Sequence, residues 1–389
     1  MNYVGIDISK HKHDVFVVSD FGEVVNDGFS FTNDAKGFKQ FLKMLVDYGG
    51  PTNNRIGFEA TGNYAINLKL FLEKNGYEFM EINPLLVNEY IKSETLRKTI
   101  TDKICARHIA GYLLEKAYKP HQTEFYDGFA LKQLTRFRHS LVKTRSKYLV
   151  GLTNILDCIF PEFKPFFEGK FSVTALYILA HYPTPATIAN MKSPTYDKLR
   201  RVSRGHFSMP QFVELKSLAK NTVGVYQKHY GIQLETLMDL HSQIDCKIDE
   251  VETEIEEIIR ELNPPTLSIR GIGESSAAVI VAECGNFSRF SSPNRLLAFA
   301  GLEPGKFRSG TLAHEGKMVK RGSSHLRYAL MNCANTVCLH NEVFAEYYRK
   351  KRNEGKEHNV ARNHVAKKLV RIIYALETKG MMFDPDMLR

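Results

Sequence analysis

The sequence predicts a multidomain protein, with an α/β domain at its N-terminus and α-helical structure in most of the remainder. Three observations support this prediction. The N-terminal third alternates strand-like and helix-like patterns, the stretch 125–262 has a predominantly helical pattern, and Pro264-Pro265 separates that stretch from a further helix-rich region. At 389 residues the chain also exceeds the usual size of one hydrophobic core. We therefore expect three domains, spanning 1–124, 125–265 and 266–389.

Three strand-like runs open the N-terminal region, and alternating helices and strands follow them. This order is typical of an RNase H-like domain, which we predict for 1–124. The expected strands cover 3–9, 14–19, 23–32, 55–60 and 77–82, and the expected helices cover 35–48 and 64–75, with further helices beyond Pro84.

One long amphipathic helix is expected over 234–262. Its apolar residues follow a 3-4 spacing, and glutamates crowd the intervening face. The spacing is typical of a coiled coil or a long helical hairpin, so we expect this helix to mediate self-association. A helix packed inside its own domain shows the same pattern, and that alternative stays open. The apolar positions are Leu237, Leu240, Ile244, Ile248, Val251, Ile255, Ile258 and Leu262.

The composition indicates a folded protein with a polyanionic partner. The net charge is +10 and the pI is about 9.1, a balance that ribosomal and membrane-surface proteins share. The six cysteines are scattered without a CxxC motif, which favours a reducing cytosol and argues against structural zinc. No signal-peptide pattern opens the sequence, and no apolar stretch reaches membrane-spanning length. We therefore predict a cytoplasmic protein that binds nucleic acid and no membrane.

Asp7 is a single carboxylate inside the apolar run that opens the chain. Strand alternation places Ile6 and Ile8 on one face and Asp7 on the other. An unpaired carboxylate in a central strand is costly unless a cation neutralises it, and a hard divalent metal does so where further carboxylates converge. A surface strand, in which Asp7 pairs with Lys10, is the alternative.

Two further carboxylates repeat this pattern. Glu59 lies in the strand-like run 56–62, and Asp102 lies at the start of a helix that ends near Leu114. Carboxylates from two strands and a helix suit a divalent-metal phosphoryl-transfer site, because they hold the metal and leave positions open for phosphate oxygens. Each residue alone also fits a simpler role, and Asp102 in particular fits a helix N-cap.

The turn Gly271-Ile-Gly273 precedes the Ala-rich helix expected over 275–282. It resembles a helix-hairpin-helix element, in which glycines bring backbone N–H groups and a helix N-terminus to a DNA phosphate. An ordinary glycine turn is the alternative.

Ser309 precedes Gly310 in a strongly basic segment. Positive charge there would attract a phosphodiester, favour the serine alkoxide and stabilise a pentavalent transition state. A serine in a basic loop also fits a simple phosphate contact, so two roles stay open. The surrounding cations are Lys306, Arg308, Lys317, Lys320, Arg321 and Arg327.

These motifs together resemble one known family. The ordered set resembles the DEDD-type insertion-sequence transposases of the IS-one-ten family, which include the pilin gene invertase. The resemblance spans both ends of the chain and is weak over 125–262. The motifs that carry it are Gly5-Ile-Asp7, Phe58-Glu-Ala-Thr-Gly62, Thr101-Asp-Lys-Ile104, Gly271-Ile-Gly273, Gly301-Leu-Glu-Pro304, Ser309-Gly310 and Lys320-Arg-Gly-Ser323 with Leu326-Arg327.

The resemblance implies a RuvC-like N-terminal domain, a helical linker with a coiled coil, and a C-terminal transposase domain. It implies an RNA-guided DNA recombinase that excises and inserts its own element. The family's acidic positions correspond to Asp7, Glu59 and Asp102, which would hold Mg²⁺, and its serine nucleophile corresponds to Ser309.

The resemblance also implies partners. These are the donor and target DNA of the element, a structured non-coding guide RNA (the bridge RNA) that pairs with both, and further copies of the chain in a dimer to tetramer. The acidic cluster of one protomer would act with the serine of another. The implied location is the bacterial or archaeal cytoplasm, at the nucleoid.

Cys105 occupies the family's fourth acidic position. Residues 102 and 105 are three apart on the expected helix, so Cys105 is expected to face the same site. A thiol is a poor ligand for Mg²⁺, which prefers oxygen. Either three carboxylates and water suffice, or this chain has impaired activity.

Two other functions fit the same residues. A RuvC-like nuclease that uses metal-activated water needs the acidic cluster but not Ser309. A non-catalytic nucleic-acid-binding protein needs neither, and Cys105 makes it plausible. A covalent DNA–protein adduct separates the first alternative from the recombinase, and metal-independent binding without strand breakage identifies the second.

Overall fold

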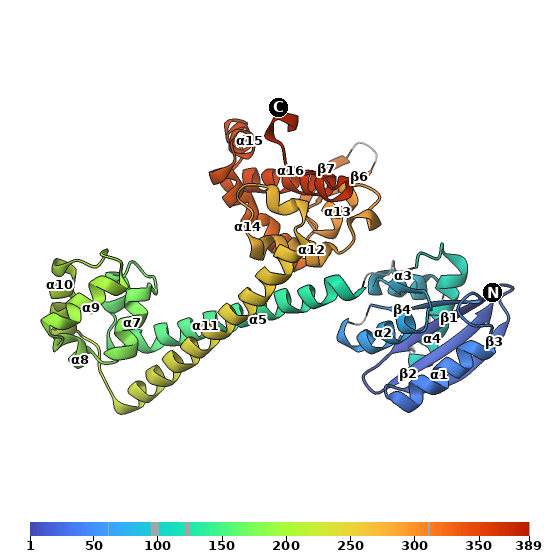
Figure 1. Cartoon of the computed structure of the whole chain (residues 1–389), viewed down its shortest axis with the longest axis horizontal. Helices are drawn as coiled ribbons and strands as arrows, with labels where there is room; N and C mark the ends of the chain where they lie inside the picture. Colours follow the sequence, from blue (N-terminus) through green and yellow to red (C-terminus); the bar gives the residue numbers. More distant parts are fainter. Residues whose placement is uncertain (61, 95–100, 121–124, 310–311, 389) are drawn as a thin grey trace. The chain divides into compact units, whose positions relative to one another are not determined.

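The computed structural model describes residues 1–60, 62–94, 101–120, 125–309 and 312–388, and at 63, 125–127, 306–309, 312–317, 387 and 388 it describes the main chain but not the side chains. The chain divides into two compact units, Met1–Phe125 and Tyr126–Arg389. Figure 1 labels the elements along the chain. Among the described helices, none combines the length and the hydropathy needed to cross a bilayer.

The first unit is a five-stranded mixed sheet with helices on both faces. The strand order is β3-β2-β1-β4-β5, in which β1, β2 and β3 pair antiparallel, while β4 pairs parallel with β1 and β5 parallel with β4. The elements are β1 (Asn2–Ile8), β2 (Lys12–Ser19), β3 (Val24–Thr32), α1 (Ala35–Asp47), β4 (Asn54–Glu59), η1 (Gly62–Ala65), α2 (Ile66–Lys74), β5 (Phe79–Ile82), α3 (Pro84–Glu94) and α4 (Asp102–Glu115).

Every strand and helix expected in this unit is present, with boundaries that differ by two residues or fewer. The helix expected from residue 64 differs in type at its start, because the 3₁₀ turn η1 precedes α2. The mixed α/β architecture predicted for the N-terminal part is therefore confirmed.

Strand alternation divides the core of this unit between the two faces of the sheet. Val4 and Ile6 of β1 pack with Phe41 of α1 and Leu68 of α2 on one face. The other face, which carries Tyr3, Gly5 and Asp7 of β1, packs against α4. Asp7 therefore lies on the face that α4 covers.

Two glycines let α4 lie close to the sheet. A Cβ on Gly5 would stand 2.2 Å from the carbonyl oxygen of Ala106 and 2.4 Å from the backbone nitrogen of Ala110. A Cβ on Gly57 of β4 would stand 2.7 Å from Leu113 Cδ2. The contact at Gly5 involves helix backbone, which cannot rotate away, so a side chain there would push α4 off the sheet.

The second unit combines a long helical hairpin, a small helical bundle and a helix-rich C-terminal part. Its elements are α5 (Phe125–Ile159), α6 (Phe163–Phe166), α7 (Val173–His181), α8 (Pro185–Ala189), α9 (Ser193–Val202), α10 (Met209–Lys220), α11 (Lys228–Leu262), η2 (Pro265–Ser268), α12 (Glu274–Cys284), η3 (Phe287–Arg289), α13 (Pro293–Phe299), β6 (Pro304–Ser309), β7 (Leu312–Met318), α14 (Ser324–His340), α15 (Glu342–Asn353), α16 (His358–Lys379) and η4 (Pro385–Leu388).

Helices α5 and α11 run antiparallel along each other (Figure 1). Arg145 Nη1 lies 2.5 Å from Asp245 Oδ1, Arg138 pairs with Glu252, and Gly151 lies beside Leu237. Residues nearer the C-terminus of α5 thus contact residues nearer the N-terminus of α11, which is the pattern of an antiparallel pair. The expected helix is confirmed, although it begins at Lys228 rather than at residue 234.

The apolar stripe of α11 packs partly within the same unit. Ile248 and Ile255 are buried, and Ile255 belongs to the C-terminal core. A charge at either position would therefore disturb folding of the unit itself. Self-association through this helix stays a prediction, and the intramolecular alternative accounts for its most buried residues.

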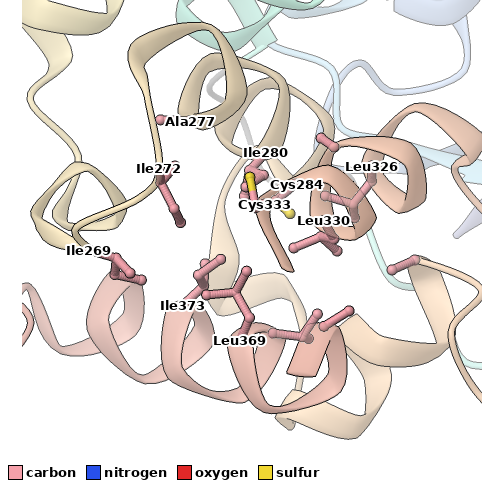
Figure 2. Packing of buried hydrophobic residues seen from close by; sticks show 14 of the residues in the cluster. Ile269, Ile272, Ala277, Ile280, Cys284, Leu326, Leu330, Cys333, Leu369 and Ile373 are labelled. Carbon is pink, nitrogen blue, oxygen red and sulfur yellow. The ribbon is translucent and has the colours of Figure 1, made fainter. Parts of the chain in front are cut away.

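One hydrophobic core joins the C-terminal helices α12, α14 and α16 (Figure 2). The segment before α12 contributes to it, and the hairpin β6–β7 connects α13 to α14. The labelled core residues in Figure 2 are Ile269, Ile272, Ala277, Ile280, Cys284, Leu326, Leu330, Cys333, Leu369 and Ile373. The predicted boundaries of three domains stay a proposal.

We expect Gly5→Ala to destabilise the first unit by about 2–3 kcal/mol, because the added Cβ overlaps the backbone of α4. Urea denaturation of the full chain, with hydrogen exchange of the α4 amides as a local readout, measures this. Gly28→Ala is the matched control, since a Cβ there meets nothing within 4 Å, and its effect should stay within ~0.5 kcal/mol. Equal effects of the two substitutions would contradict the role of Gly5.

Candidate active site

The site begins with two carboxylates at the ends of neighbouring parallel strands. Ile6 of β1 pairs with Phe58 of β4, so the next residues, Asp7 and Glu59, lie side by side where the pairing of these two strands ends. Each follows a glycine by two positions, Gly5 on β1 and Gly57 on β4. Each therefore shares a face with the glycine that admits α4. Asp7 and Glu59 are both half-buried.

Asp102 enters the site from α4. Thr101 caps this helix, because its side chain accepts a hydrogen bond from the backbone N–H of Ile104 at 3.4 Å. The N-cap alternative for Asp102 is therefore wrong, and its carboxylate is an exposed group in the first turn of the helix. Negative charge in that turn is favourable, since the unpaired N–H groups of the helix point toward it.

Electrostatic coupling indicates that these carboxylates lie close together. Burial raises the pKa of Asp7 to about 6, and the negative charges of Asp102 and Glu59 contribute to the rise. Burial also raises the pKa of Glu59. The charges of the three acidic residues that the sequence predicted on separate elements thus act on one another.

Cys105 lies at the same site. Burial raises the pKa of its thiol to about 11, and the negative charges of Asp7, Glu59 and Asp102 contribute. Cys105 therefore faces the carboxylates, as its spacing from Asp102 predicts. A thiol with this pKa is neutral at physiological pH.

Asp14 is a nearby carboxylate that the sequence analysis missed. It is the cross-strand partner of Asp7, on β2, and it is 3% exposed. Its Oδ1 lies 3.0 Å from Nζ of Lys12, and its negative charge is a further cause of the raised pKa of Asp7. A signal was present in the sequence, since a hairpin between the first two strands sets Asp14 opposite Asp7.

The donor set suits a hard divalent cation. Asp7, Glu59 and Asp102 offer carboxylate oxygens, and none of the three forms an ion pair with a described residue. Within the described part of the chain, no three His, Cys, Asp or Glu side chains are already arranged as a metal-binding group. Two carboxylates affect each other's pKa over longer distances than those at which they could share one metal ion. Their like charges also repel each other when no cation lies between them. The carboxylates therefore fit a metal but do not form a preformed cage.

The first glycine of the turn before α12 packs against the backbone of α14. Gly271 has a φ of +106°, and a Cβ there would stand 2.7 Å from Val337 Cα of α14. Gly273 caps α12 without a side chain. Glu274, the first residue of the helix, forms a two-pronged ion pair with Arg260, at 2.8 and 3.0 Å. A carboxylate thus occupies the helix start where a DNA phosphate was predicted to bind.

The basic segment around Ser309 is described in part. Ser309 is the last residue of β6 and pairs with Leu312, the first residue of β7. The side chains of Ser309, Lys306, Arg308 and Lys317 lie outside the described residues, so their predicted contacts stay predictions.

The loop after β7 is described with its side chains. Lys320 and Arg321 are exposed, in keeping with the predicted contacts to the phosphate backbone of a nucleic acid. Arg327 instead donates from Nη1 to the carbonyl oxygens of Ala300 (3.3 Å) and Lys320 (3.2 Å). Its guanidinium therefore fastens this loop to the end of α13, a structural role in addition to the predicted contact with nucleic acid.

Comparison with known proteins gives matches at both ends of the chain. Residues 4–161 match the DEDD domain of IS110 type, described as a transposase, and residues 266–349 match the domain described as transposase IS116/IS110/IS902 family. The mini-circle putative transposase for IS117 of Streptomyces coelicolor is 24% identical over 97% of this chain and 94% of its own length. The pilin gene-inverting protein of Moraxella bovis is 23% identical over 98% of this chain and 97% of its own length.

We expect Asp7→Asn to stabilise the first unit by about 1 kcal/mol at pH 8, after allowance for the partial exposure of this carboxylate. The folded pKa of about 6 exceeds the ordinary value of 3.8, so charged Asp7 destabilises the fold above pH 6 and has no such effect below pH 4. The advantage of the variant should therefore fade between pH 6 and pH 4. Urea denaturation across this range measures it, and a destabilised variant at pH 8 would show that Asp7 is held by a favourable partner.

Proposed function

Since the chain belongs to the IS110/IS116/IS902 family of transposases, we propose that it is an RNA-guided DNA recombinase that excises and inserts its own element. The observation that carries the proposal is the convergence of Asp7, Glu59 and Asp102 in the first unit. Three carboxylates whose charges act on one another, with no cationic partner in the described part of the chain, suit phosphoryl transfer better than a structural role.

The first unit supports a RuvC-like, RNase H-like assignment. Its strand order, with three antiparallel strands followed by two parallel ones, agrees with the order of elements that led to the prediction. The carboxyl ends of β1 and β4 then place Asp7 and Glu59 at one edge of the sheet. Ligand sites of sheets with parallel strands favour that edge.

Asp7, Glu59 and Asp102 would hold Mg²⁺ in this proposal. A bound divalent cation would supply charge stabilisation for the phosphoryl oxygens of the DNA. Cys105 occupies the fourth position, and the buried carboxylate of Asp14 adds to the negative field at Asp7.

Ser309 is the proposed nucleophile. Its hydroxyl oxygen attacks a phosphodiester phosphorus, a serine–phosphorus bond forms, and the bond to one deoxyribose oxygen breaks. The serine proton is lost and the departing oxygen takes up a proton. A deoxyribose hydroxyl of the second strand then attacks the phosphoserine, which rejoins DNA and restores the serine hydroxyl.

The remaining parts of the proposal concern partners. The acidic cluster would act with Ser309 of another protomer, so the active form would be a dimer to tetramer. A guide RNA would pair with donor and target DNA, and the positive net charge of the chain suits both nucleic acids. Such a protein works at the nucleoid, in the cytoplasm of a bacterium or archaeon.

Ser309→Ala should abolish strand exchange and leave RNA and DNA binding close to wild type, because it deletes one oxygen from a basic segment. Denaturing wild-type reactions and probing for protein covalently bound to DNA measures the intermediate. Ser324→Ala is the control, since this exposed serine follows the α14 cap and should keep both activities. A covalent adduct in Ser309→Ala would assign the nucleophile elsewhere, and wild-type recombination without any adduct would favour metal-activated water.

Cys105→Asp should raise recombination and lower the Mg²⁺ concentration needed for half-maximal rate several-fold, because it adds an oxygen ligand beside Asp102. Recombination measured across a Mg²⁺ titration reads both quantities. Cys105→Ser, which adds no charge, should change neither. An unchanged metal requirement in Cys105→Asp would remove position 105 from the metal site.

A further inference from the structure

The two long helices of the second unit carry opposite charge. Between residues 128 and 156, α5 has six Lys and Arg residues and no Asp or Glu. Over Lys228–Leu262, α11 has ten Asp and Glu residues against three Lys and Arg residues. A solvated helix pair usually mixes both signs on each helix. This separation of charge therefore calls for an explanation beyond solubility.

Ion pairs between the two helices account for only part of the basic charge. Arg138 and Arg145 pair with Glu252 and Asp245 of α11. The other four Lys and Arg residues of α5 are spaced four, seven and four residues apart, which places them along one separate face of the helix. This face, the cationic stripe, consists of Lys132, Arg136, Lys143 and Lys147.

The start of α14 lies beside the stripe. The rings of His139 and His325 are 4.8 Å apart, and those of His139 and Tyr328 are 5.8 Å apart. Tyr328 is 60% exposed, so an aromatic face is available next to the basic side chains. Burial lowers the pKa of His325, and the positive charges of Arg136 and Lys143 contribute.

A buried ion pair fixes this arrangement. Glu283, at the end of α12, is 1% exposed and accepts hydrogen bonds from Arg136 Nε at 2.7 Å and Nη2 at 3.0 Å. It also accepts a hydrogen bond from the hydroxyl of Ser323, the N-cap of α14, at 2.8 Å. The carboxylate of Glu283 therefore links α5 to the start of α14. This link fixes the position of the stripe relative to Tyr328.

We propose that the cationic stripe and the exposed face of Tyr328 bind the phosphate backbone of a nucleic acid. Lys143 and Lys147 are exposed, and neither forms an ion pair within the described part of the chain. Lys143 and Lys147 lie about one turn apart, about 6 Å along the helix, which spans about two phosphates of one strand. The exposed tyrosine adds a surface on which a base or sugar packs.

This site goes beyond the proposed function, because it requires neither Ser309 nor the acidic cluster. The acidic outer face of α11 in a second copy is the competing occupant, since its charge is also complementary to the stripe. We favour nucleic acid because salt-resistant pairing of helices needs apolar contacts, and the stripe contains none.

The test compares the full-length double variant Lys143→Gln/Lys147→Gln with Lys220→Gln/Lys228→Gln, which removes the same charge from α10 and α11. The probes are a labelled 30-base-pair DNA duplex and an RNA hairpin of equal charge, each titrated at several salt concentrations. The stripe variant should bind one or both probes about tenfold more weakly at 0.1 M salt, and the slope of log affinity against log salt should fall by about 2. The control should stay near wild type, and the probe that loses more identifies the bound nucleic acid.

Two results would overturn the proposal. Equal losses in both variants would show that only net charge matters. A lower mass by light scattering in the stripe variant, with unchanged binding of both probes, would assign the stripe to a second copy of the chain. Because the readout is binding of the probes rather than recombination, failure of the proposed chemistry and failure of this binding site are distinguishable.

Discussion

The close contact between α4 and the sheet is the constraint on which the acidic site depends. Gly5 allows the backbone of α4 to lie where any side chain would stand, and that approach brings Asp102 and Cys105 toward the ends of β1 and β4. The same approach partly buries Asp7 and raises its pKa. One missing Cβ therefore sets both the position and the electrostatics of the site.

This arrangement carries an energetic conflict that a cation would relieve. Asp7 faces other carboxylates on neighbouring elements, and Asp14 stands directly across the strand pair. Lys12 pairs with Asp14, whereas no described residue forms an ion pair with Asp7. A fold retains such repulsion where the charged form has a use, and phosphoryl transfer is a use that requires it.

Much of the fold and of the acidic site could be predicted from sequence, because both follow from local patterns of residues. Alternation along β1 placed Asp7 opposite Ile6 and Ile8, and the helix carrying Asp102 placed Cys105 on the same face. Adjacent Thr101 and Asp102 are both good N-caps, so sequence alone could not assign the cap. The start of α11 was missed because residues 228–233 carry little apolar periodicity. The burial of Asp14 and Glu283 depends on helices distant in sequence, which no local pattern reveals.

The antiparallel pair of α5 and α11 has a consequence for how partners approach. A basic helix beside an acidic one is a transverse electric dipole, oriented across the hairpin rather than along it. Near a polyanion the second unit would experience a torque that turns α5 toward the polymer, over distances of about one Debye length of 8–10 Å. Orientation would then precede contact, and encounters through the wrong side would be repelled before they form.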